Sequence, residues 1–382
     1  MILAIILLTV TTGCGERKHS TYDVITVDVT KRYLKKELIL QDFMDVEYIA
    51  LETTDEFLTQ GVVMAVGKEI VIVKNRINDG DIFIFDRAGK GIRKINRKGQ
   101  GGEEYNYSSE IVLDEDSNEM FIIDSQARKI QVYDLFGKFK RSFNFSDTSN
   151  YSSIFNFNKD NLISYKSYKS TEGEQPCFLI VSKQDGNITR EIRIPLKRII
   201  KPIVTTVING IDNYAETYLH QIIPYFGNFL LVEASSDTVF SYLSDGTLIP
   251  FIIRTPSIHF MDPEVFLHPC VLTNHYYFIQ SIKKTFDFEK GFGFPVTNLV
   301  FDKQENALFE PTVYNDDFTT QIRVGMWSNS VNHEIATFQI IEAYQLVDDY
   351  KEGRLKDGKL KEIASKLDEE DNPVIMLIKH KK

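Results

Sequence analysis

The glycine-rich stretch Gly99-Gln100-Gly101-Gly102 is the first candidate for chemistry in this sequence, because backbone N–H groups in such a loop can cradle a phosphate. A phosphate-binding loop also needs Lys and Ser or Thr where a helix begins. Here Glu103 and Glu104 follow, and their charges would repel phosphate. The pattern therefore favours a sharp loop between two strands. Side chains on such a loop can line a ligand pocket, and the rim residues that we predict are Arg97, Lys98, Glu103, Glu104 and Tyr105.

An acidic stretch further along begins like a calcium-binding loop. Asp114, Asp116 and Asn118 have the spacing of the first ligands of such a loop. However, Glu119 stands where the loop needs glycine, and Ser125 stands where it needs a glutamate that binds through both oxygens. We therefore predict a hairpin turn here rather than a metal site.

Three histidines, His259, His268 and His275, lie within one stretch and could meet in space. Their spacing matches no helical zinc motif and no pair of cysteines accompanies them, so structural or surface histidines are favoured. The sequence also lacks a Gly-x-Ser-x-Gly nucleophile motif. We therefore predict no catalytic residue, no metal site and no cofactor, and any paired acid–base role of the carboxylates depends on distances in the fold.

The composition indicates which elements must position these residues. The chain is 43% hydrophobic, enough for a substantial core, and its 27 Phe and 18 Tyr favour pleated sheets, on which aromatic rings pack well. A formal net charge of -10 argues against sequence-independent binding to nucleic acid, which needs a basic face. An all-β protein with no nucleic-acid partner is therefore expected.

A strand–turn–strand pattern recurs along the chain. In its clearest copy, residues 82–86 and 91–95 are the two strands and Gly89 marks the tight turn. Weaker copies turn at Asp185-Gly186, at Asp245-Gly246 and near Asn306, a spacing of roughly 50 to 60 residues that suits a four-stranded propeller blade. The second copy overlays the first at seven positions: Ile82, Ile84, Phe85, Asp86, Gly89, Lys90 and Arg93 fall on Ile130, Val132, Tyr133, Asp134, Gly137, Lys138 and Arg141.

The C-terminal part departs from this pattern. Residues 322–326 and 335–340 read as strands, 342–355 and 359–367 as two helices, and 374–378 as the last strand. The count of units gives six blades, and we expect residues 43–51 to pair with the sixth blade, because that pairing closes the ring. The predicted fold is a six-bladed β-propeller over residues 23–382, with a short helical insertion at about 342–368 before the last strand.

The N-terminal residues indicate where in the cell the protein is located. Residues 2–10 form an apolar run that leads into Thr11-Thr12-Gly13-Cys14, which resembles a bacterial lipobox. The resemblance implies a signal peptide over residues 1–13, a lipid on Cys14, and a tether over residues 14–22. The expected location is the cell envelope, on the periplasmic or the outer-membrane surface, with a lipid anchor in the membrane. The two other cysteines, Cys177 and Cys270, could be bonded or reduced.

Four pieces of the chain stand out together: residues 48–55 (YIALETTD), 83–90 (FIFDRAGK), 99–105 (GQGGEEY) and 371–375 (DNPVI). As a group they resemble a known family, the six-bladed β-propeller lipoproteins of Bacteroidetes, which are related in shape to NHL-repeat propellers. This resemblance supports the fold and the envelope location, and implies no settled activity. In the glycine loop, Gly102 and Glu103 replace the family's usual Pro-Gly.

Two functions remain open at this point. The first is a binding propeller that recognises a glycan, a peptide or a partner protein in the outer membrane, with glycan favoured if aromatic rings cluster at one mouth of the channel. The alternative is a metal-dependent hydrolase or lyase, which predicts three or four His, Asp, Glu or Asn side chains converging at the ring axis. The fold alone does not decide between them, because propellers host both.

Overall fold

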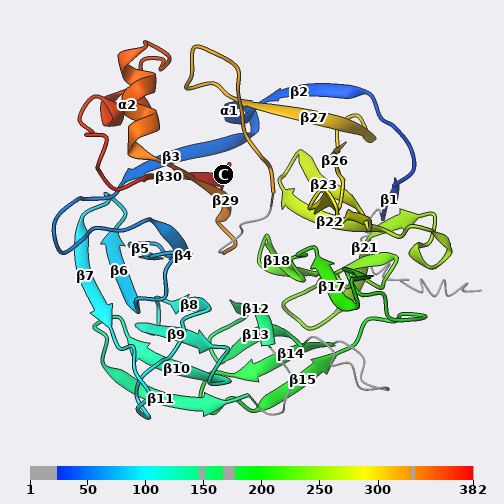
Figure 1. Cartoon of the computed structure of the whole chain (residues 1–382), viewed down its shortest axis with the longest axis horizontal. Helices are drawn as coiled ribbons and strands as arrows, with labels where there is room; N and C mark the ends of the chain where they lie inside the picture. The colour runs from blue at the N-terminus through cyan, green and yellow to red at the C-terminus, as the bar shows by residue number, and fades with distance from the viewer. Residues whose placement is uncertain (1–23, 146–150, 167–176, 328–331, 382) are drawn as a thin grey trace, which may run out of the picture.

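The structure is a computed structural model that describes residues 24–145, 151–166, 177–327 and 332–381. The predicted signal peptide, Cys14 and the predicted tether lie outside these residues. Six sheets surround a central channel, which confirms the predicted six-bladed β-propeller (Figure 1). Among the described residues, no helix is both long and apolar enough to cross a membrane.

Blades 1 to 3 each consist of four consecutive antiparallel strands that follow one another from the channel to the rim. Their middle strands are buried on both faces, since each blade packs against two neighbours, and this explains the unbroken apolar runs at 70–73, 82–85 and 120–123. The strands are β4 (Val62–Val66), β5 (Ile70–Lys74), β6 (Asp81–Asp86) and β7 (Gly91–Asn96) in blade 1; β8 (Glu110–Asp114), β9 (Glu119–Asp124), β10 (Lys129–Asp134) and β11 (Phe139–Asn144) in blade 2; and β12 (Tyr151–Asn156), β13 (Asn161–Lys166), β14 (Cys177–Ser182) and β15 (Ile188–Ile192) in blade 3.

Blades 4 and 5 each carry a fifth, outer strand that comes from the N-terminus and runs parallel to its neighbour. The alternation of residues 23–29 is typical of a strand, but it does not indicate the distant strand with which β1 pairs. Blade 4 contains β18 (Ile222–Tyr225), β19 (Asn228–Leu231), β20 (Thr238–Tyr242), β21 (Leu248–Thr255) and β1 (Ile25–Asp28); blade 5 contains β22 (Val265–Leu272), β23 (Tyr276–Lys283), β26 (Val296–Asp302), β27 (Ala307–Asn315) and β2 (Lys35–Ile39), with β28 (Ile322–Arg323) on the end of β27.

Blade 6 closes the ring with strands from both ends of the chain, as predicted. β3 (Met44–Ala50) pairs along its whole length with β30 (Val374–His380), and β30 pairs with β29 (Ile335–Ile341). The predicted strand at 322–326 is confirmed only for Ile322 and Arg323, which form β28, and is wrong for residues 324–326. Residues 324–327 instead lie beside β29 through side chains, because Gln339 Nε2 donates to the Gly325 carbonyl at 3.2 Å and Thr337 Oγ1 donates to the Trp327 carbonyl at 3.0 Å.

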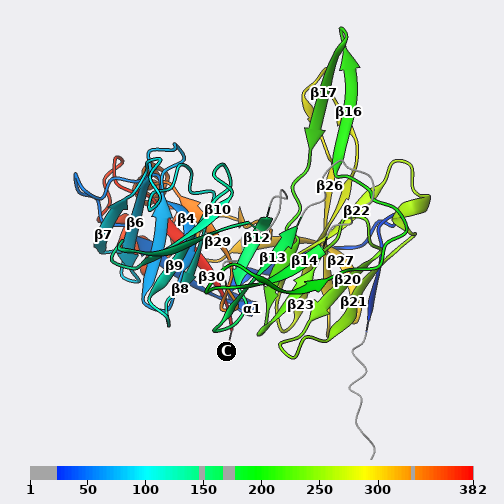
Figure 2. The same cartoon turned by 90° about the horizontal axis from the view of Figure 1, so that it is seen from below.

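The helical insertion is present but shorter than predicted. Helix α2 (Ala343–Lys351) ends before Gly353, which adopts a left-handed φ of 68°, and α3 (Lys359–Ala364) follows after a turn. Smaller elements are α1 (Leu40–Phe43), the 3-10 turn η1 (Ile258–Phe260) and the two-stranded ribbon β24 (Phe286–Asp287) and β25 (Phe292–Gly293). A longer hairpin, β16 (Ile203–Ile208) and β17 (Ile211–Glu216), connects blade 3 to blade 4 and projects from one face of the ring (Figure 2).

The recurring turn at Gly89 has a structural role in ring closure. Gly89 adopts a φ of 87°, and its counterpart Gly137 a φ of 81°, which L side chains rarely adopt. The Gly89 carbonyl accepts a hydrogen bond from the Glu52 N–H at 2.8 Å. A Cβ on Gly89 would lie 1.9 Å from the Ala50 carbonyl oxygen, so the turn can approach the end of β3 only without a side chain.

We expect Gly89→Ala to lower the free energy of unfolding by about 2–3 kcal/mol, since it combines backbone strain with a clash at the ring seam. Gly210→Ala is the matched control, because Gly210 has a φ of 78° but open space around it, and should cost only about 1 kcal/mol. Urea unfolding of both variants measures the difference. Equal losses would show that the contact with Ala50 is unimportant.

Candidate functional site

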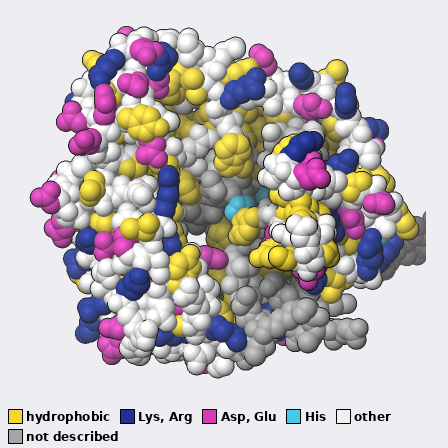
Figure 3. All heavy atoms as spheres, viewed as in Figure 1, with side chains coloured by type: hydrophobic (Ala, Val, Ile, Leu, Met, Phe, Trp, Pro, Cys, Tyr) yellow, Lys and Arg dark blue, Asp and Glu magenta, His cyan; other side chains and the backbone are white. Residues whose placement is uncertain are grey.

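The channel contains a cavity of 470 Å³ that is open to solvent and lined by the inner strands β4, β8 and β12, by residues around β18, and by residues 332–334. In Figure 3 the centre of the ring is hollow, and histidine side chains are visible there. The inner strands β4, β8, β12 and β18 run in the same direction, so their first residues meet at one mouth, on the side of the β16–β17 hairpin (Figure 2). The inner strand of blade 6, β29, runs the opposite way, because Asn332 before it donates to the carbonyl of Val66 at the end of β4. The apolar wall consists mainly of Val63, Ala65, Ile111, Leu113, Ile154, Phe155, Pro224 and Phe229.

Four polar side chains gather at this hairpin-side mouth, which we define by Glu110, Ser153, Tyr218 and His220. Glu110 is the first residue of β8, Ser153 lies in β12, and the other two immediately precede β18. Their positions follow from the fold, because each lies at or near the start of an inner strand. Sequence analysis did not select these four residues. Only the position of Glu110 in the sequence could have indicated its role, since Glu110 is the first residue of the inner strand that follows the glycine loop.

Glu110 is the main charged group of this mouth. Its Oε2 accepts the Ile154 N–H at 3.0 Å, and the Ser153 N–H is also directed to the carboxylate. Burial raises the pKa of Glu110 above its usual value, and the two backbone N–H groups only partly oppose this effect. Among the ion pairs of the described residues, none involves Glu110. The mouth therefore offers a desolvated carboxylate that has no cationic partner among the described residues.

Ser153 and Tyr218 extend this polar surface. Ser153 has a left-handed φ of 50° and donates from Oγ to Gln221 Oε1 at 2.9 Å. Burial, and then the charge of Glu110, raise the pKa of the Tyr218 hydroxyl, which also hydrogen-bonds to Ser153. The Tyr218 side chain is nevertheless 64% exposed, so its ring is available to a ligand that enters the channel.

Two histidines form the wall behind Tyr218. The His220 and His268 rings stack at 5.7 Å, and the His220 backbone N–H donates to His268 Nε2 at 3.0 Å. Burial lowers the pKa of His220 to about 4, and burial followed by the charge of His220 lowers the pKa of His268 to about 3. Both rings are therefore neutral near pH 7 and add no positive charge beside Glu110.

The histidines singled out in the sequence do not assemble into a metal site. His268 lies in β22, His259 lies in η1, and His275 lies in the turn before β23, where its Nδ1 is 3.3 Å from Gln304 Nε2. Within the described ranges there is no group of three or more His, Cys, Asp or Glu side chains that could hold a metal ion. The convergence that the metal-dependent alternative predicts is therefore not found in the part of the chain that the structure describes.

The five rim residues predicted from the glycine loop lie together between β7 and β8, but none of them lines the channel cavity. Tyr105 is fully buried, and its hydroxyl donates to the Gly80 carbonyl at 2.6 Å. Arg97 Nε donates to the Gly137 carbonyl at 3.2 Å, and Glu104 Oε2 accepts the Gly101 N–H at 2.8 Å. Lys98 Nζ donates to the Asn78 carbonyl, and the Glu103 carbonyl accepts the Tyr133 hydroxyl. The contacts of all five residues hold the loop and its neighbours in place.

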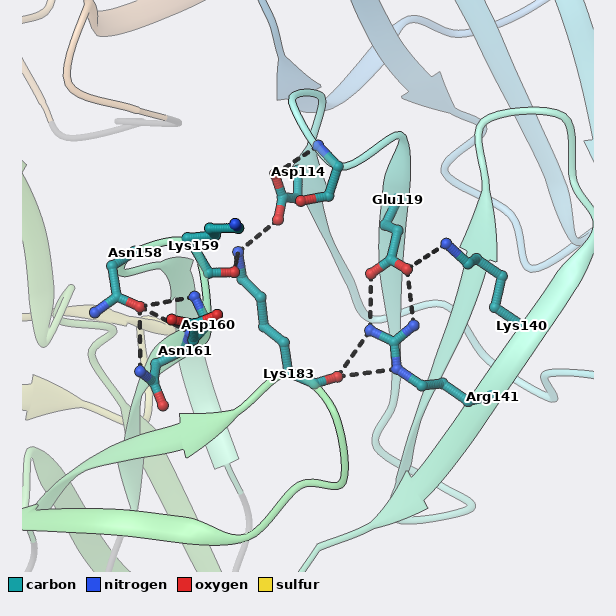
Figure 4. Close-up of polar contacts among 10 residues, drawn as sticks. Asp114, Glu119, Lys140, Arg141, Asn158, Lys159, Asp160, Asn161 and Lys183 are labelled. Atoms are coloured by element: carbon teal, nitrogen blue, oxygen red, sulfur yellow. Dashed lines mark hydrogen bonds and ion pairs between the residues drawn. The ribbon is translucent and has the colours of Figure 1, made fainter.

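The calcium-like stretch is a hairpin turn between β8 and β9, as predicted, and its first acid forms a buried ion pair. Lys183 Nζ lies 2.5 Å from Asp114 Oδ2, with the two residues 5% and 4% exposed (Figure 4). The Lys183 carbonyl accepts from Arg141, whose guanidinium also binds Glu119 in a two-pronged pair and holds the pKa of Glu119 at about 2. This network fastens blade 2 to blade 3 and is structural.

The opposite mouth differs from the hairpin side, because its lysine is paired with an acid and its amide side chain bonds to the backbone, although His333 Nδ1 is buried without a hydrogen-bond partner among the described residues. Lys68 pairs with Asp116 at 2.8 Å, and Asn332 Oδ1 accepts the N–H groups of Glu334 and Ile335. Burial lowers the pKa of His333. The hairpin-side mouth is therefore the better candidate for ligand binding.

Comparison with known proteins supports the fold. A crystal structure named "Putative exported protein", from Bacteroides fragilis, is 15% identical, with a TM-score of 0.61 over 94% of this chain and 100% of that chain. A member of the DUF4221 family from Bacteroides vulgatus is 10% identical, with a TM-score of 0.44 over 89% of this chain and 100% of that chain. No curated protein matches the sequence. Residues 24–379 match the model of the family described as Domain of unknown function (DUF4934), so the chain belongs to that family.

Proposed function

We propose that this chain is a lipid-anchored protein of the cell envelope whose propeller channel binds a peptide. The anchor rests on the apolar run at 2–10 and the lipobox-like Thr11-Thr12-Gly13-Cys14. The name of the Bacteroides fragilis structure, an exported protein, fits the same address. The observation that carries the binding proposal is the carboxylate of Glu110, desolvated and unpaired within the described chain, at the mouth of an amphipathic cavity.

Such a carboxylate favours a cationic ligand. Burial strengthens its attraction for a positive charge, because the surrounding medium screens that charge less than water does. The apolar wall of the cavity suits an aliphatic stem, so a lysine or arginine side chain matches both parts of the site. Four other acids line the cavity and have the same sign of charge as Glu110: Asp114, Glu115, Asp116 and Glu334. Two of them are already paired, Asp114 with Lys183 and Asp116 with Lys68.

A glycan is less well matched to this mouth. Sugars bind by stacking on exposed ring faces, and of the three Phe and Tyr rings that line the cavity only Tyr218 is exposed. Phe229 is buried and Phe155 is half-buried within the packing between blades. Among the described residues that line the cavity, there is therefore no cluster of accessible rings of the kind that would favour glycan.

Calorimetric titration of the full-length chain with Cys14→Ser tests this proposal. Nα-acetyl-lysine methylamide should bind, whereas the norleucine derivative, which has the same stem without the charge, should bind at least about tenfold more weakly. Glu110→Gln should remove this preference without loss of stability, since it replaces a desolvated charge with a neutral group of the same shape. Preference for an N-acetylglucosamine oligosaccharide, or equal binding of lysine by Glu110→Gln, would refute the proposal.

The pH dependence has a defined sign. Since the pKa of Glu110 is raised above 4.5, lowering the pH neutralises the carboxylate earlier than an ordinary glutamate. Affinity for the lysine derivative should therefore fall as the pH decreases through this raised pKa, and Glu110→Gln should show no such fall. Titrations that begin at alkaline pH, where the carboxylate is ionised, and descend to pH 4 measure both curves.

A further inference from the structure

The β16–β17 hairpin projects from the ring (Figure 2), and the channel site does not account for it. It stands out from the ring face as a two-stranded sheet (Figure 2). Isolated two-stranded ribbons are marginally stable in water, and each strand has one edge with no neighbouring strand in the described chain. An open edge of this kind is where an extended peptide can add a strand.

One face of β17 carries a regular pattern of acidic and aromatic side chains. Asp212, Tyr214 and Glu216 alternate along the strand, so they share one face, and all three are exposed, with Tyr214 73% exposed. Their cross-strand neighbours on β16 are Val207, Thr205 and Ile203, none of which can neutralise the acids. This face therefore presents a tyrosine ring with one carboxylate on each side of it.

The pattern leads directly into the proposed ligand site. Two residues after Glu216, the exposed ring of Tyr218 lines the channel cavity next to Glu110. Acidic or aromatic side chains therefore recur at every second residue from Asp212 on the hairpin to Tyr218 at the hairpin-side mouth. No ion pair among the described residues occupies Asp212 or Glu216, so both carboxylates are available to an incoming chain.

We propose that the open edge of β17 binds an extended basic peptide as an added strand and guides one of its cationic side chains to Glu110. This inference rests on the proposed function of the channel and names the form of its ligand. Residues of an added strand that point to the same face recur every second position, so alternate lysines or arginines would lie beside Asp212, Tyr214 and Glu216. Opposite charges across neighbouring strands stabilise the pairing, and cations stack favourably on a tyrosine ring.

The same charges argue against a second copy of this chain as the occupant. Pairing two β17 edges would bring Asp212 and Glu216 of one copy against the same acids of the other, and like charges on neighbouring strands are destabilising. An anionic lipid surface is disfavoured for the same reason. The acidic face therefore selects a basic partner.

Fluorescence anisotropy with a labelled ten-residue peptide of alternating Lys and Val tests this inference on the full-length chain with Cys14→Ser. The variant Asp212→Asn/Tyr214→Ala/Glu216→Gln should weaken binding by about tenfold or more, since it removes two charge pairs and a ring contact. The control Asp357→Asn/Glu362→Gln removes two exposed acids near α3 and should change the affinity by less than about twofold. An alternating Glu and Val peptide should not bind.

The variants separate the two proposals. If the hairpin variant binds the peptide normally while Glu110→Gln loses it, the hairpin inference is wrong and the channel site stands. If the hairpin and control variants lose affinity equally, the attraction is a general effect of net charge and the inference fails. Dimerisation of the chain that the hairpin variant abolishes would also overturn it, because the edge would then belong to a second copy.

Discussion

Asn372→Ala is expected to lower the free energy of unfolding by about 3–5 kcal/mol, although it removes only one small side chain. Asn372 is 1% exposed and bonds to three backbone groups of the loop that connects β3 to β4. Its Nδ2 donates to the carbonyls of Glu52 at 2.8 Å and Phe57 at 2.5 Å, and its Oδ1 accepts the Thr59 N–H at 2.8 Å. Alanine would leave these backbone groups without their partner, and each such loss costs about 1–3 kcal/mol when the group stays buried.

Chemical denaturation measures this loss, provided that the free energy of unfolding falls with denaturant concentration at the same slope in the variant and in the parent chain. Asn298→Ala is the control, because Asn298 is exposed in β26 and its side chain accepts a single hydrogen bond among the described residues, from Gln280. That variant should change stability by less than about 1 kcal/mol. Asn372→Asp, which retains the acceptor but places a carboxylate against two carbonyls, should be as damaging as alanine. A stability near that of the parent chain in either Asn372 variant would show that the seam does not depend on this residue.

Lys183→Met is expected to destabilise the protein by a similar amount, about 3–5 kcal/mol, because it leaves the Asp114 carboxylate buried without its cation. The 2.5 Å contact between Lys183 Nζ and Asp114 Oδ2 is the main compensation for burying both charges. Asp114→Asn should also destabilise the chain, since it leaves the Lys183 ammonium group buried without its anion. The double variant should recover part of the loss, because neither charge then remains unpaired.

A neighbouring pair provides the control for this experiment. Lys68 and Asp116 form the same kind of contact at 2.8 Å, but their side chains are 69% and 81% exposed. Lys68→Met should therefore change the free energy of unfolding by less than about 1 kcal/mol. Similar losses for Lys183→Met and Lys68→Met would mean that burial does not set the energy of the first pair. Strictly additive losses in the Asp114 and Lys183 variants would show that the two side chains do not interact.

The fold was largely predictable because its signals are local. The turn at Asp86–Gly89 and its copy at Asp134–Gly137 need a left-handed glycine and an acid whose carboxylate accepts the following N–H groups, and both needs are visible in the residue types. Closure by β3 followed from the count of strands. The parallel partners of β1 and β2 were not predictable, since nothing local distinguishes one outer blade edge from another.

The candidate site was much less predictable than the fold. The glycine loop attracted attention through its composition, yet that composition serves a tight turn around the buried ring of Tyr105. Glu110, Tyr218 and His220 have no motif that joins them, and they meet only because three inner strands begin at one mouth. Their burial and the resulting pKa shifts depend on the closed ring, which no local pattern of residues encodes.

The pairing of the N-terminal strands has a consequence for the order of assembly. β1 pairs with β21, β2 with β27, and β3 with β30. Each of the first three strands therefore pairs with a strand that is synthesised much later. The hydrogen bond from the Thr59 N–H to Asn372 spans 313 positions of the chain. Contacts of such long range are slow to form, because loop entropy is lost before they are made. The ring can therefore close only after the whole chain is available, and its last seam forms at the end of folding.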